Sequence, residues 1–76
     1  MQTVTRHEIL RGLLQEAVAG EAIRYRILEH ARRTVASLTP GTVEHHNAAR
    51  AAGFCLASYR NQRDLVGSLS RQVGLL

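Results

Sequence analysis

Few side chains in this sequence are of the types that carry out chemistry, and they are widely spaced. The nucleophile candidate is Cys55, the only cysteine, which sits among alanine and leucine residues. A thiol buried in such surroundings behaves as an inert small hydrophobe. The candidate bases are His30, His45 and His46, and nothing in their spacing pairs one of them with Cys55. We therefore expect a protein without enzymatic activity and without catalytic residues.

Metal binding is not indicated either. His45 and His46 are adjacent, and on a helix their side chains diverge by about 100°, so they cannot easily share one metal ion. The six acidic residues are scattered singly, and no cysteine or histidine pair has the spacing of metal ligands. The sequence predicts neither a metal site nor a cofactor.

One segment resembles a nucleic-acid-binding motif. Residues 39–46 read Thr-Pro-Gly-Thr-Val-Glu-His-His. With the residues that precede it, this stretch resembles the helix-turn-helix of response-regulator-type transcription factors, whose second helix opens with a Ser/Thr cap, then Gly-Thr-Val and a nearby histidine. The resemblance implies phosphate contacts from Arg32 and Arg33. It also implies that four side chains face the major groove: His45, His46, Asn47 and Arg50. DNA binding through residues 39–50 is thus the alternative hypothesis for function.

The elements that position these side chains are predicted to be helices. Thr5 and Glu8 form a capping box, in which each side chain satisfies a free backbone N–H of the first turn. Apolar residues then recur at helical spacing. The pattern predicts a helix over residues 6–19, with Gly20 where many helices end.

Residues 21–38 fit two templates. The run from Ile23 to Ile27 alternates as a β-strand does, and Thr34-Val35 would suit a returning strand. The residues between them include no Gly, Asn, Asp or Pro to make the turn. The helical template places the apolar residues on one side at 100° per residue. We therefore expect a helix over residues 21–38, either separate from the first or joined to it through a kink at Gly20.

The clearest interruption of the chain is Thr39-Pro40-Gly41-Thr42. Thr39 suits a helix cap and Pro40 the first helical position, so we expect a further helix over residues 40–72. The expected fold is all-α, with one small domain over residues 1–76. It is either a helical hairpin or a three-helix bundle with a long C-terminal helix.

The C-terminal helix carries a heptad pattern, in which small and apolar residues alternate at spacings of three and four. The residues expected at an interface are Ala48, Ala52, Cys55, Tyr59, Gln62, Val66, Leu69 and Val73. The pattern continues to Leu76. Such a seam calls for a long partner helix, and we expect a homodimer through it. Packing against the first two predicted helices of the same chain is the other interpretation.

The charge of the chain constrains its partners. All ten basic residues are arginine, against six acidic residues, which gives a formal net charge of +4. A basic protein favours an acidic protein surface or nucleic acid. We expect Arg24, Arg26 and Arg33 to form the face that meets an acidic protein.

These observations favour a small non-enzymatic protein-binding module. It would act as an inhibitor, an adaptor or an assembly component, of the kind found among phage and mobile-element accessory proteins. No stretch is apolar enough to cross a membrane, and the first residues do not resemble a signal peptide. With a single cysteine, a reducing and therefore cytoplasmic location is expected.

Overall fold

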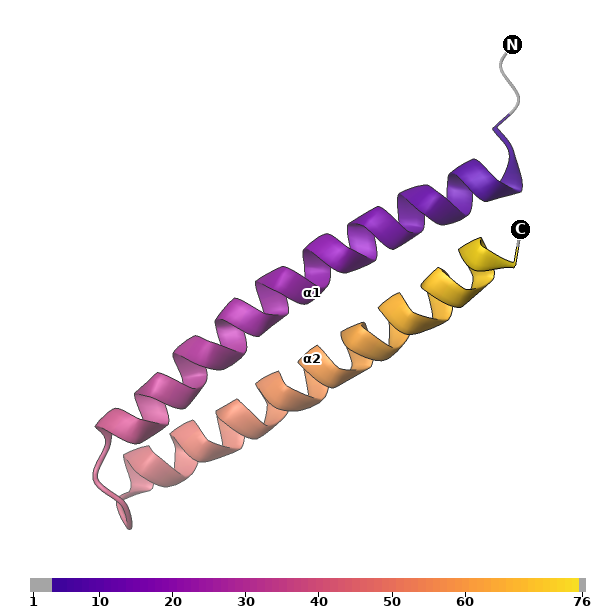
Figure 1. The fold of residues 1–76 in the computed structure, drawn as a ribbon. Coiled ribbons are helices and arrows are strands. Elements are labelled where there is room, and N and C mark those ends of the chain that lie inside the picture. Colours follow the sequence, from indigo (N-terminus) through magenta and orange to yellow (C-terminus); the bar gives the residue numbers. More distant parts are fainter. Residues whose placement is uncertain (1–3, 76) are drawn as a thin grey trace.

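Two long α-helices joined by a short turn make up the protein (Figure 1). The computed structural model describes residues 4–75. Helix α1 spans Arg6–Ser37 and α2 spans Val43–Gly74. They lie antiparallel and side by side, with the turn at one end of the molecule and both chain ends at the other. The result is an elongated all-α hairpin that measures 59 × 23 × 13 Å.

Helix α1 begins where the sequence predicts and then continues past the expected break. The Thr5 side chain accepts a hydrogen bond of 3.1 Å from the backbone N–H of Glu8, which confirms the helix start. Of the two alternatives at Gly20, the boundary between helices 6–19 and 21–38 is wrong and the joined helix is confirmed, because α1 runs through Gly20 as one helix. A glycine in a helix interior costs only about 1 kcal/mol relative to alanine. Packing of α1 against α2 on both sides of Gly20 outweighs that cost.

Two further expectations need correction. The strand alternative for residues 21–38 is wrong, since this segment is helical throughout apart from its last residue, Leu38. The three-helix alternative is wrong as well, because the described residues form two helices. The hairpin alternative is confirmed.

The turn between the helices explains why α2 starts later than expected. Gly41 has a φ of 88°, a left-handed conformation that glycine adopts without steric cost. The chain therefore reverses at Gly41, and Pro40 belongs to the turn instead of the first helical position. Thr42 then caps α2: its hydroxyl oxygen accepts a bond of 3.2 Å from the N–H of His45 and donates one of 2.7 Å to the carbonyl of Thr39.

The core is a single strip between the two helices. The inward side of α1 repeats at spacings of four and three residues, the pattern of helices packed as in a coiled coil. Its members are Leu10, Leu14, Ala17, Glu21, Arg24, Leu28, Ala31 and Val35. Only Ala17 and Leu28, 4% and 2% exposed, are buried among the described residues. Two helices cover each other along one side only, so most apolar side chains of the hairpin keep contact with water.

Candidate interaction surfaces

The heptad residues of α2 lie on the side of this helix that faces α1. All of them, from Ala48 to Val73, are half-buried. The ring of Tyr59 packs against that of Tyr25 in α1, with centroids 5.6 Å apart and planes inclined by 57°. In the same strip, the Gln62 amide donates a hydrogen bond of 2.9 Å to the Ala17 carbonyl. The long partner helix that the pattern calls for is thus α1 of the same chain. Leu76, the last residue of the predicted seam, lies outside the described residues.

Polar groups cross the strip near its middle. Arg24 donates from Nε to the Ser58 hydroxyl at 3.2 Å and from Nη1 to the carbonyl of Gly20 at 3.3 Å. Gly20 has a packing role here, because a Cβ atom at this position would lie 2.8 Å from Nε2 of Gln62. The bare backbone of Gly20 leaves the room that Gln62 needs to reach α1.

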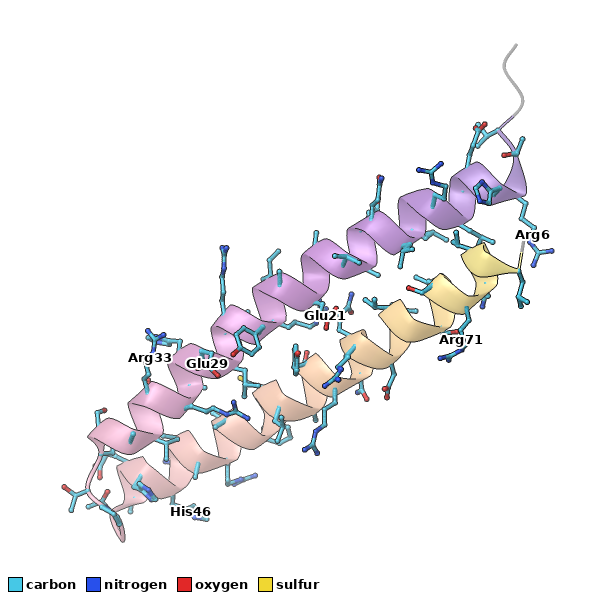
Figure 2. The ribbon with its side chains drawn as sticks, in the orientation of Figure 1. Arg6, Glu21, Glu29, Arg33, His46 and Arg71 are labelled. Atoms are coloured by element: carbon cyan, nitrogen blue, oxygen red, sulfur yellow. The ribbon has the colours of Figure 1, made fainter. Side chains whose placement is uncertain are left out.

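The three arginines expected to face an acidic partner do not lie together. Arg24 is half-buried and bonded between the helices, whereas Arg26 and Arg33 are exposed on the outward side of α1. Figure 2 shows Arg33 near the turn, on the same stretch of α1 as Glu29. In residues 4–75 the one ion pair joins Glu29 to Arg32 at 3.1 Å. Arg26 and Arg33 therefore remain available to an acidic partner, and Arg24 is already engaged within the hairpin.

Exposed apolar side chains gather on one broad side of the hairpin, which we call the apolar face. It is defined by six side chains, each 46–70% exposed: Ile9, Leu13, Ile23, Ile27, Phe54 and Leu65. Two shallow hollows on this side show that both helices contribute. Leu13 and Leu65 line the first, and Ile27 and Phe54 line the second. Exposed apolar side chains gathered on one side in this way mark a candidate binding surface.

Sequence reasoning missed this face. The residues of α1 that form it occupy positions immediately beside the inward positions of the heptad, such as Leu13 before Leu14 and Ile27 before Leu28. The sequence does contain a sign of this face: apolar residues occupy a wider part of the circumference of α1 than a single partner helix covers.

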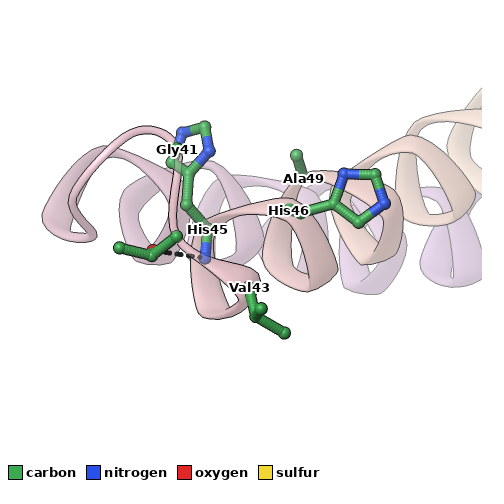
Figure 3. A pocket seen from close by; sticks show the side chains of 6 residues that line it. Gly41, Val43, His45, His46 and Ala49 are labelled. Carbon is green, nitrogen blue, oxygen red and sulfur yellow. Dashed lines mark hydrogen bonds between the residues drawn. The ribbon is translucent and has the colours of Figure 1, made fainter.

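The residues of the DNA-binding hypothesis lie around the turn and the first turns of α2. His45 and His46 line a hollow there with Gly41 and Ala49 (Figure 3), while Asn47 and Arg50 are exposed farther along α2. In a helix-turn-helix the two helices meet at about 90–120°. Here α1 and α2 are antiparallel, so this segment does not have that geometry. Nucleic-acid contacts by these residues stay a prediction.

The remaining candidates for chemistry are scattered. Cys55 is half-buried in the strip, and its thiol is free. Within residues 4–75, no three histidine, cysteine or acidic side chains come close enough together to hold a metal ion. Neither helix is long and apolar enough, over the part of the chain described, to cross a membrane.

Fold and surface together define a class of protein: an antiparallel two-helix hairpin with one broad apolar face. Comparisons with protein-family models, with curated proteins and with solved structures found no match for this chain.

Proposed function

We propose that this chain is a non-enzymatic protein-binding module, an inhibitor, adaptor or assembly component, and that it binds through the apolar face. The observation that carries the proposal is that few apolar side chains are buried and many are exposed. Among residues 4–75, two side chains are buried, while six large apolar side chains on one side stay about half exposed or more. Covering apolar surface is favourable by about 25 cal/mol per Å², so a protein partner on this face gains most of its affinity there.

The exposed arginines support an additional contact with an acidic protein surface, on the outward side of α1 and outside the apolar face. Arg26 and Arg33 lie on this outward side. Charges at the rim of an interface raise the association rate and select the partner, more than they raise the affinity. The expected salt dependence is therefore in the rate of association.

Site-specific photo-cross-linking in cells tests the proposal. A benzophenone amino acid replaces Phe54, which is 70% exposed on the apolar face. The matched control carries the same group in place of Arg60, an exposed α2 residue on the opposite side of the hairpin. We expect covalent protein adducts from position 54 and far fewer from position 60. Equal yields at the two positions, or no adduct at either, would overturn the proposal.

A further inference from the structure

We infer that the partner of the apolar face is a second copy of this chain, laid face to face with its ends reversed, so that two hairpins form a four-helix bundle. The inference rests on the proposed function, since it names the partner of the same face. The sequence predicts a homodimer through the heptad seam of α2. Because α1 covers that seam, the two copies meet instead through the open side of the hairpin.

The first support is the size of the face against the size of the core. The hairpin is 59 Å long and 23 Å wide. A side with this outline is large enough to hold an interface of the roughly 800 Å² per partner that stable complexes bury. Chains of this length rarely build a sufficient core alone, and association is one of the common remedies. A second hairpin would enclose the six exposed side chains in a layer between four helices.

The second support is that the face is self-complementary when its ends are reversed. A two-fold axis across the middle of the hairpin brings together positions that are equally far from the two ends of a helix. In α2, Phe54 is eleven residues from Val43 and Leu65 is nine from Gly74, so these two apolar side chains come close to each other across the axis.

The third support is the charge in the two hollows of the face. Glu16 lines the hollow that contains Leu13 and Leu65, and Arg24 lines the hollow that contains Ile27 and Phe54. The Arg24 guanidinium is bonded within the hairpin to two neutral acceptors, the Ser58 hydroxyl and the Gly20 carbonyl, so its charge is not neutralised there. Reversing the ends places the hollow with the carboxylate opposite the hollow with the guanidinium. If the ends were aligned instead, each hollow would lie opposite the same hollow of the other copy, and like charges would face each other. Opposite charges across an interface fix its orientation.

The molecular mass in solution tests the association. We expect light scattering to give twice 8.4 kDa for the wild-type chain at micromolar concentration. Ile23→Asp should shift the protein to 8.4 kDa or raise its dissociation constant at least tenfold. The matched control is Val18→Asp, on the same helix and similarly exposed (49% against 56%), but on the side that carries Tyr25. The control should keep the dimeric mass. A wild-type chain that stays monomeric up to about 200 µM, which corresponds to a dissociation constant far weaker than micromolar, would overturn the inference.

Cross-linking of the purified chain keeps the inference testable if the aspartate variant fails to fold. With the benzophenone group at position 54, we expect a product of twice the chain mass and an adduct mapped near Leu65 of the second copy. An adduct mapped near Ile27 of the second copy, which lies at the same level of the hairpin as Phe54, would show that the ends are aligned and would overturn the reversed orientation. If the purified chain gives no adduct but cells give one with a different protein, the second-copy inference fails and the proposed function stands. If neither gives an adduct, both fail.

Discussion

The side-chain amide of Gln62 donates a hydrogen bond of 2.9 Å to the main-chain carbonyl of Ala17, which joins the middle of α2 to the backbone of α1. Gln62 reaches that carbonyl beside Gly20, where a Cβ atom would approach its amide nitrogen to 2.8 Å. A polar residue in a heptad seam fixes the alignment of the helices, because a shift along the axis would remove its partner. Gly20 and Gln62 therefore act as a pair: the glycine leaves the space, and the glutamine amide makes the bond to α1.

Gln62→Ala should lower the free energy of unfolding by about 1 kcal/mol, the usual net value of one hydrogen bond. Urea unfolding at a single protein concentration measures this loss. Gln72→Ala, on an exposed position of the same helix, is the control and should change the value by less than about 0.5 kcal/mol. Equal losses in the two variants would show that the bond to Ala17 contributes nothing of its own.

Two glycine-to-alanine variants should differ. Gly12→Ala meets no atom within 4 Å, so it should raise the free energy of unfolding by up to about 1 kcal/mol through helix propensity alone. In Gly20→Ala the same gain is offset by displacement of Gln62, and we expect a net change close to zero. When Gln62 is already alanine, Gly20→Ala should stabilise the chain, but by less than Gly12→Ala does, because the added Cβ still lies 3.0 Å from Nη1 of Arg24. A double-mutant cycle measured by urea unfolding gives this coupling, and additive effects would contradict it.

The helix termini show how far local sequence signals reach. The Thr5 cap was predictable because both hydrogen-bonding groups lie within one turn of chain. The start of α2 was not, since Thr39 and Thr42 are both good caps and both are followed by residues that suit a helix. Only the reversal of direction at Gly41 decides between them, and that reversal is set by the packing of α1 on α2.

The apolar face shows a feature that local sequence patterns do not predict, namely which apolar residues of a helix are covered. Ile23, Ile27 and Val35 fall on one side of α1 by helical spacing, yet Val35 is half-buried while Ile23 and Ile27 are exposed. One partner helix covers a narrow strip of that arc. Periodicity reports that a helix side is apolar, but the number of neighbouring helices determines how much of it is covered.

Leu28→Ala should be the most destabilising single truncation in the hairpin. Leu28 is only 2% exposed and is the largest fully buried side chain of residues 4–75. Removing a buried leucine side chain costs about 2–5 kcal/mol, from lost burial and from the cavity left behind. Val18→Ala, on an exposed position of α1, should cost less than about 0.5 kcal/mol. Thermal unfolding followed by circular dichroism compares the two, and a Leu28 variant as stable as the Val18 variant would contradict the observed core.

Thr42→Ala should lower the free energy of unfolding by about 1 kcal/mol, the common value for a lost helix cap. Two bonds depend on this hydroxyl, one from the N–H of His45 and one to the carbonyl of Thr39, so its loss affects both the helix start and the turn. Thr42→Ser keeps the hydroxyl and should retain most of the stability, as measured by urea unfolding. If serine were as destabilising as alanine, the methyl group of Thr42 would be the stabilising part. The rank order of the two variants thus separates capping from packing at the one place where the chain reverses.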